Sequence, residues 1–297
     1  MGKYGIVDIG SNTVRLEIYN DENNELVRFF KKKENLGLTS YINDGVISEK
    51  GISRLIEILS DYVNICKNIR TNDLFIFATA AIRNSKNVKE ILKEIKDSTG
   101  VKVDLLSGDR EAELGFKAVT DAFGITSGLN IDIGGGSTEF TLFDDGIVKL
   151  SKSMNNGSLT FFSNYIEGII PTKKEAKLIK KEVKTYMKLE GFATKPRKQI
   201  TGVGGTIRLL GRLIREYYNL GFKTFFNVNE LKTVIDKLIE QDKTTVRILL
   251  QLSPDRIHTI VPGALILLAI CEYFSVEDIL VSESGVRTGY LLEKLQK

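Results

Sequence analysis

Two similar stretches decide the fold of this chain: Val7-Asp8-Ile9-Gly10-Ser11-Asn12-Thr13-Val14-Arg15 and Ile131-Asp132-Ile133-Gly134-Gly135-Gly136-Ser137-Thr138-Glu139. In each copy an aspartate lies near the end of an apolar run, and a turn of glycine and small polar residues follows. Alternating residues then continue to Tyr19 in the first copy and to Phe143 in the second. Such alternation is typical of β-strands. Each copy therefore predicts two strands joined by a tight turn, and the repetition indicates an internal duplication at the scale of a domain.

The segments around both copies predict an α/β fold. In the first half, strand and helix patterns alternate after three strands, in the order 4–9, 14–19, 25–33, 52–69, 74–78, 88–95, 101–105 and 109–122. The second half has an Asp145-Gly146 hairpin turn, a capping box from Thr172 to Glu175, a short strand at 200–203 and a buried helix at 261–274. Strands interleaved with helices are typical of α/β domains.

The length of 297 residues is that of about two domains. We predict two domains, 1–124 and 125–297, with a ligand cleft between them. The last helix, about 286–297, is an alternative member of the first domain, because it could pack against it. A chain with one histidine can build no histidine-rich zinc site, and a histidine-based catalytic triad would need that residue, His258. We therefore expect a carboxylate as general base and a hard cation such as Mg²⁺ as the metal.

The net charge and the apolar segments bear on where in the cell the protein is located. The chain has 42 lysines and arginines and 38 aspartates and glutamates, which gives a formal net charge of +4. This charge does not by itself indicate that the chain binds nucleic acid. The N-terminus lacks a signal core, and the apolar run 257–271 is shorter than the roughly 20 residues of a spanning helix. Cys66 and Cys271 are expected as buried thiols. We predict a cytoplasmic protein without a membrane anchor.

The two turns predict a phosphate clamp. Glycines let backbone N–H groups approach a phosphate closely, and hydroxyl side chains add donors. The aspartates at the strand ends, Asp8 and Asp132, are placed to bind Mg²⁺ or to orient a water molecule. Two unrelated tight hairpins are the alternative. The predicted phosphate-binding residues of the two turns are Ser11, Asn12, Thr13, Gly134, Gly135, Gly136 and Ser137.

A third glycine turn, Gly204-Gly205-Thr206, follows a strand and precedes a helix. Taken alone, this turn predicts the start of a helix and a ligand-binding loop equally well. The presence of two other predicted phosphate loops favours ligand binding. In the segment 107–113, Glu111 is the candidate general base for water, and the alternative is a carboxylate that only serves the helix dipole. Arg83, just past a strand end, suits phosphate oxygens, although a single arginine is more often a surface ion-pair partner.

This set of motifs closely resembles the exopolyphosphatase/guanosine pentaphosphate phosphatase (Ppx/GppA) family. The resemblance rests on residues 8–13, 78–83, 107–112 and 132–139, with later echoes at 204–206, 262–264 and 285–287, and it runs in order over nearly the whole chain. It implies a duplicated ribonuclease H-like (actin-like ATPase) fold and Mg²⁺-dependent release of terminal phosphate from polyphosphate or guanosine pentaphosphate. It also implies that Glu111 activates the attacking water, and that Asp132 and Glu139, joined by Asp8, hold metal or water.

Two residues depart from the family pattern. His258 stands where relatives usually carry an acid, and Thr160 stands where an arginine is expected. A lost arginine, together with the absence of the C-terminal helical domains of longer members, makes short polyphosphates the expected substrates. The sequence leaves open whether His258 tunes binding or only packs.

We therefore expect an exopolyphosphatase. The alternatives are a guanosine pentaphosphate hydrolase, a sensor that binds polyphosphate or nucleotide with little turnover, and a kinase or chaperone of the same fold. The sequence does not decide the oligomeric state and leaves a homodimer open.

Overall fold

The computed structural model describes residues 2–22, 25–193, 195–221 and 223–295 and divides into two compact units. The first unit is Met1–Glu111 together with Tyr290–Lys297, and the second is Ala112–Gly289. Helix α4 (Gly108–Phe123) therefore belongs mostly to the second unit. The domain boundary predicted from the sequence, between 124 and 125, would have placed this helix in the first domain. Helix α11 (Val286–Lys294) begins in the second unit and ends in the first.

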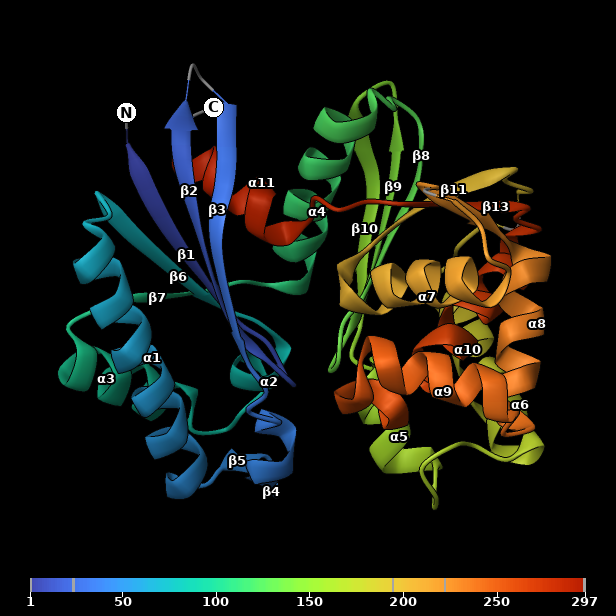
Figure 1. Cartoon of the computed structure of the whole chain (residues 1–297), viewed down its shortest axis with the longest axis horizontal. Coiled ribbons are helices and arrows are strands. Elements are labelled where there is room, and N and C mark those ends of the chain that lie inside the picture. Colours follow the sequence, from blue (N-terminus) through green and yellow to red (C-terminus); the bar gives the residue numbers. More distant parts are fainter. Residues whose placement is uncertain (1, 23–24, 194, 222, 296–297) are drawn as a thin grey trace. The chain divides into compact units, whose positions relative to one another are not determined.

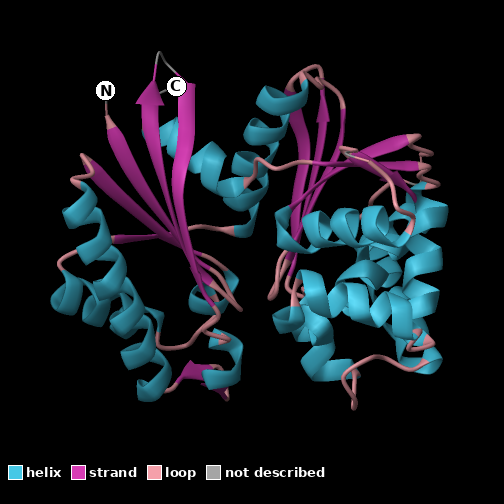
Figure 2. Cartoon of the chain, viewed as in Figure 1, coloured by secondary structure: helices cyan, strands magenta, loops and turns pink. Residues whose placement is uncertain are grey.

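The first unit is built on a five-stranded sheet (Figures 1 and 2). Its order is β3-β2-β1-β6-β7, with β1, β2 and β3 antiparallel and β1, β6 and β7 parallel. The strands are β1 (Lys3–Ile9), β2 (Val14–Glu22), β3 (Glu25–Glu34), β6 (Asp73–Ala78) and β7 (Val103–Leu105). All five lie within or close to the predicted strands, and β1, β2, β6 and β7 contribute buried residues to the core.

Helices α1 (Glu49–Ile69) and α3 (Val88–Thr99) share one core with this sheet. The hydroxyl of Ser48 accepts a hydrogen bond from the N–H of Gly51 and caps the N-terminus of α1. Tyr290 of α11 stacks on Phe77 of β6 with 4.9 Å between ring centroids, and its hydroxyl donates to Asp104 of β7 at 2.6 Å. These two contacts attach the end of the chain to the first unit.

The second unit repeats the same strand order. Its sheet is β10-β9-β8-β11-β13-β12, so β10, β9, β8, β11 and β13 correspond to β3, β2, β1, β6 and β7. The strands are β8 (Gly128–Ile133), β9 (Thr138–Asp144), β10 (Ile147–Met154), β11 (Gln199–Val203), β12 (Phe225–Asn227) and β13 (Asp278–Val281). The turn before β10 contains Asp145 and Gly146, both with positive φ, as its sequence indicated. The repeated order confirms the predicted duplication.

Six helices complete the described part of the second unit: α5 (Ser158–Tyr165), α6 (Lys173–Leu189), α7 (Gly204–Tyr217), α8 (Val228–Ile239), α9 (Lys243–Leu252) and α10 (Ile257–Phe274). The segment Pro254–Phe274 is long and apolar enough to cross a membrane, but 78% of its most apolar stretch of 18 residues is buried in the structure. Such burial is typical of a core helix, and α10 contributes most of its residues to the hydrophobic core. Cys66 and Cys271 are buried free thiols, as predicted, and burial raises the pKa of Cys66 to about 11.

Several short elements were not predicted from the sequence. They are the hairpin β4 (Ile42–Asn43) and β5 (Val46–Ile47), the one-turn helix α2 (Ala80–Arg83), and α5, α9, β12 and β13. Strand β13 has only four residues, and α2 has only one turn, so neither is long enough for a periodic pattern to appear.

Candidate active site

The two glycine turns are closed by the same hydrogen bond. The N–H of Gly10 donates to the carbonyl oxygen of Thr13 at 3.0 Å, and the N–H of Gly134 donates to that of Ser137 at 2.9 Å. A Cβ atom at Gly10 would lie 3.2 Å from the Thr13 oxygen, and one at Gly134 would lie 3.1 Å from the Ser137 oxygen. The duplication therefore extends from strand order to individual backbone bonds, and glycine is needed for this close approach.

In the first turn, backbone groups from a neighbouring loop satisfy the carbonyl oxygens. Asn12 accepts from the N–H of Gly37 at 2.8 Å, and Ser11 accepts from that of Thr39 at 3.3 Å. The N–H groups of Ser11 and Asn12 have no acceptor in the described part of the chain. A run of such N–H groups is the arrangement that binds anions.

Ser11 carries a second available donor. Its residue is only 4% exposed, and its hydroxyl oxygen has no hydrogen-bond partner among the described residues. Leaving a buried hydroxyl unsatisfied costs about 1–3 kcal/mol. A bound phosphate oxygen would remove this cost. Thr13, also buried, completes the turn beside the half-buried Asn12.

In the second turn, the donors to the carbonyl oxygens come from a helix and not from a loop. Helix α5 points its N-terminal N–H groups at the carbonyl oxygens of the turn, Ser158 donating to Gly134 at 2.9 Å and Leu159 donating to Gly135 at 2.8 Å. The N–H groups of Gly135 and Gly136 have no acceptor within the described ranges. The second turn is therefore also a candidate anion site, formed by Gly134, Gly135, Gly136 and the buried Ser137.

Thr160 has a structural role in this arrangement. Its hydroxyl accepts from the N–H of Gly157 at 2.6 Å and donates to the Gly157 carbonyl at 3.0 Å, which fixes the first turn of α5. A Cβ atom at Gly157 would lie 2.6 Å from the carbonyl oxygen of Gly134, so glycine lets the helix approach. Where the family pattern has an arginine, this chain has a residue that stabilises the helix behind the turn.

The third glycine turn begins α7 directly after β11. Val203, the residue before the helix, pairs with Asp132 on β8, and no side chain caps the N-terminus of α7. Gly204 has φ of +90°, and a Cβ atom there would collide with the carboxylate of Asp132. The turn with Gly205 and the buried Thr206 therefore lies beside Asp132, and the open helix N-terminus favours an anion.

Asp132 and Glu139 face each other on neighbouring strands. The two residues are register partners of β8 and β9, and Glu139, 3% exposed, accepts from the Ser153 hydroxyl at 3.0 Å. Asp8 has the equivalent position on β1, where its register partner is Arg15. Among the described residues no group of three or more histidine, cysteine, aspartate or glutamate side chains is arranged to hold a metal ion. A pair of carboxylates nevertheless fits Mg²⁺, which usually binds one or two carboxylates together with waters and substrate phosphates.

Glu111 and Arg83 form a buried ion pair in the first unit. Arg83 Nη1 donates to Glu111 Oε1 and, at 2.8 Å, to the carbonyl oxygen of Leu106. The Glu111 residue is only 7% exposed. The sequence suggested a separate role for each residue and missed their pairing, in which Arg83 neutralises and orients the carboxylate.

A topological signal in the sequence could have found this pair. Arg83 follows β6 and Glu111 follows β7, and these strands are parallel neighbours. The carboxyl ends of parallel strands meet at one edge of a sheet, where ligands bind in open α/β sheets. The first glycine turn follows β1, the parallel neighbour of β6, so Ser11, Arg83 and Glu111 all belong to this edge.

His258 packs on α5. Its ring meets the ring of Phe162 edge-on with 4.9 Å between centroids. Burial lowers the pKa of His258, the Asp255 charge opposes this shift and the Arg256 charge adds to it. The neutral imidazole is therefore the form that the fold favours.

Comparison with known proteins decides the family. The model of the Ppx/GppA phosphatase family matches residues 18–297. The chain belongs to this family. Membership confirms the resemblance that its motifs indicated and the prediction of an enzyme that hydrolyses phosphate bonds.

Individual relatives agree with this assignment. The bifunctional 3-dehydroquinate synthase/phosphatase of Fusobacterium nucleatum is 31% identical over 98% of this chain, which spans 46% of that protein. Exopolyphosphatase 1 of Mycobacterium tuberculosis is 26% identical over 99% of this chain and 88% of its own length. The crystal structure of an exopolyphosphatase from Cytophaga hutchinsonii has a TM-score of 0.87 at 21% identity and covers 99% of this chain and 98% of that one. This Ppx/GppA chain therefore has the predicted fold.

The close approach of Gly204 to Asp132 predicts a large effect of substitution. Gly204→Ala adds a left-handed strain of about 1–2 kcal/mol and a steric clash of about 1–3 kcal/mol. Gly146→Ala is the matched control, because Gly146 also has a positive φ, +73°, but has open space around its Cβ position. Urea unfolding should show the larger loss for Gly204→Ala, and equal losses in the two variants would contradict the close contact.

The lowered pKa of His258 predicts a dependence of stability on pH. The unfolded chain binds a proton at this residue near pH 6.5, whereas the folded chain binds it only at lower pH. The free energy of unfolding should therefore fall as the pH falls below 6.5, until the folded residue is also protonated. Because this is the only histidine of the chain, His258→Gln should lose less stability between pH 7.5 and 5.5 in urea unfolding. A loss equal to that of the natural chain would contradict the lowered pKa.

Proposed function

We propose that this chain is an exopolyphosphatase that releases terminal phosphate from inorganic polyphosphate. The observation that carries the proposal is the buried Glu111, held by Arg83 at the sheet edge that also carries the first glycine turn. Membership in the Ppx/GppA phosphatase family supports it. The mycobacterial relative, which matches this chain over most of its own length, favours polyphosphate as the substrate class.

Glu111 is the proposed general base. A carboxylate accepts a proton only in its ionised form, and the ion pair with Arg83 favours that form while it fixes the direction of the oxygen lone pairs. Glu111 would take a proton from a water molecule as the water oxygen bonds to the terminal phosphorus. The bridging P–O bond would break, which releases phosphate and leaves a shortened polyphosphate. The other oxygens of the phosphate need donors, because catalysis of phosphoryl transfer consists mainly of positioning and charge neutralisation.

The glycine turns are the proposed phosphate-binding groups. Ser11, Asn12 and Thr13 are the proposed phosphate contacts in the first unit, and Gly134, Gly135, Gly136 and Ser137 are those in the second, with Gly204, Gly205 and Thr206 at the start of α7. In the second turn the backbone donors would be Gly135 and Gly136, because the N–H of Gly134 already donates to Ser137. Their donors are held by the fold before substrate binds. Fixed donors stabilise developing charge without reorganising.

The proposed metal ligands are the carboxylates at the strand ends. Asp132 and Glu139 are the pair that the register places together, and Asp8 is the equivalent residue of the first unit. Mg²⁺, when bound, neutralises phosphate charge. We also propose a cytoplasmic location, in agreement with the buried thiols Cys66 and Cys271.

A substrate panel tests the proposal. Phosphate release should be measured with Mg²⁺ on short polyphosphate, long polyphosphate, guanosine pentaphosphate and ATP. We expect the fastest release from polyphosphate. Release from guanosine pentaphosphate alone would establish the nucleotide hydrolase instead. Binding of polyphosphate without release from any substrate would indicate a sensor, and phosphate transfer to a second molecule would indicate a kinase.

A matched pair of variants tests the general base. Glu111→Gln keeps the size of the side chain but removes the proton acceptor, so kcat should fall by about 10²–10⁴-fold. Polyphosphate binding, measured by calorimetry, should be retained. Glu113→Gln is the control, two residues further along the same helix, and should keep most of the activity. An unchanged kcat in Glu111→Gln would remove this residue from the mechanism.

A further inference from the structure

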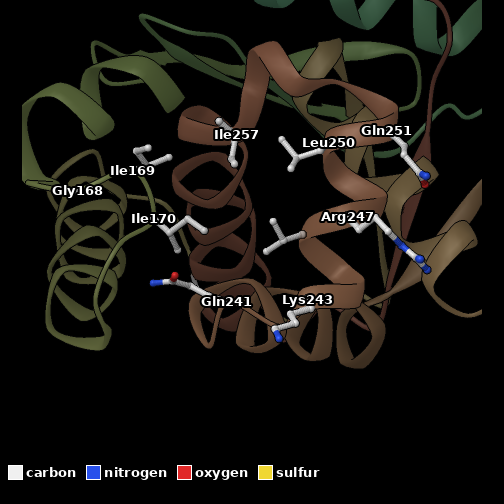
Figure 3. Close-up of a pocket in the computed structure, with 10 residues that line it drawn as sticks. Gly168, Ile169, Ile170, Gln241, Lys243, Arg247, Leu250, Gln251 and Ile257 are labelled. Atoms are coloured by element: carbon white, nitrogen blue, oxygen red, sulfur yellow. The ribbon is translucent and has the colours of Figure 1, made fainter.

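A cavity lies in the second unit, and none of the residues assigned to phosphate chemistry lines it. Its volume is about 770 Å³, and it is bounded by the loop 168–170, the helix α9 and Ile257 at the start of α10. Figure 3 shows the side chains of Ile170, Leu250 and Ile257 converging on its centre. A cavity of this size is within the range that holds a small organic ligand.

The walls of this cavity are mostly aliphatic, and two glutamines, Gln241 and Gln251, also line it. Ile169, Ile170, Val246, Leu250 and Ile257 line it, and none of these residues has a polar side chain. Ile169 is 58% exposed and Leu250 is 42% exposed, so part of the wall contacts water. These exposed aliphatic side chains surround one hollow and leave apolar area that a ligand could cover. Because aliphatic walls bind by area and not by direction, they fit a flexible hydrocarbon chain.

The edge of the cavity is cationic. Lys243 and Arg247 are four residues apart on α9, on one face of the helix, and no carboxylate pairs with either of them in the described part of the chain. The adjacent carboxylate, Asp242, is occupied by the N–H of Thr245 at 2.9 Å and by its hydroxyl at 2.8 Å. Figure 3 shows the charged ends of both cationic residues directed outward at the edge.

We propose that this cavity binds a single-chain amphiphile with an anionic headgroup, such as a fatty-acid carboxylate. The hydrocarbon tail would lie between Ile170, Leu250 and Ile257, and the headgroup would lie at the edge near Lys243 and Arg247. The aliphatic walls would bind the hydrocarbon tail, and the two cationic side chains, which have no acidic partner among the described residues, would bind the anionic headgroup. This assignment does not depend on the proposed phosphatase activity.

Titration calorimetry of the whole chain with octanoate, decanoate and octanol, each below its micelle concentration, tests the proposal. We expect decanoate to bind roughly tenfold more tightly than octanoate, because it buries two more methylene groups. Octanoate should bind more tightly than octanol, and this preference should shrink at high salt. Equal binding of octanoate and octanol would overturn the assignment of the cationic edge.

Matched variants locate the site. Leu250→Gln should weaken decanoate binding at least tenfold, whereas Leu178→Gln on α6, where leucine has the same 42% exposure, should not change it. Lys243→Glu should weaken binding severalfold more than Lys232→Glu on the neighbouring helix α8. Unchanged binding in both cavity variants would overturn the proposal. A dimer in light scattering that Leu250→Gln dissociates would also overturn it, because a second copy of the chain would then cover this face.

Discussion

The candidate active site depends on hydrogen bonds behind the glycine turns. The carbonyl oxygens of each turn accept hydrogen bonds from neighbouring backbone, from Gly37 and Thr39 in the first unit and from the N-terminus of α5 in the second. If these oxygens were free, the peptide groups could rotate, and the N–H groups would no longer share one direction. The constraint explains why Gly157 has no side chain and why Thr160 caps α5 in this chain.

The duplication conserves the turn but not its support. Both units have the same order in their five corresponding strands and the same bond that closes the turn, from Gly10 to Thr13 and from Gly134 to Ser137. The groups behind the turns differ, a loop in one unit and a helix in the other. The proposed general base lies in the first unit, where Glu111 follows β7 and pairs with Arg83. Two copies of one fold can therefore diverge in chemistry while the anion-binding backbone stays the same.

Much of this could be predicted from the sequence, for an identifiable reason. The repeated Asp-x-Gly pattern, the strands beside it and the buried helix in the segment 257–274 have regular apolar spacing, and local spacing is visible without a structure. The short elements were missed because β13, with four residues, and α2, with one turn, are too short for a periodic pattern to appear. The pairing of Arg83 with Glu111 was missed because it depends on β6 and β7 being adjacent and parallel.

The sequence alone determined the duplicated α/β architecture and the positions of the glycine turns, and it led us to expect carboxylates instead of histidine in the site. These properties follow from local patterns and from composition. Only the tertiary structure decided that Glu111 is neutralised by Arg83, that Glu139 is the register partner of Asp132, and that an aliphatic cavity lies beside α9. The physical reason is that burial, charge pairing and cavities arise from residues far apart in the chain, and the distance between such residues is set by packing of the folded core.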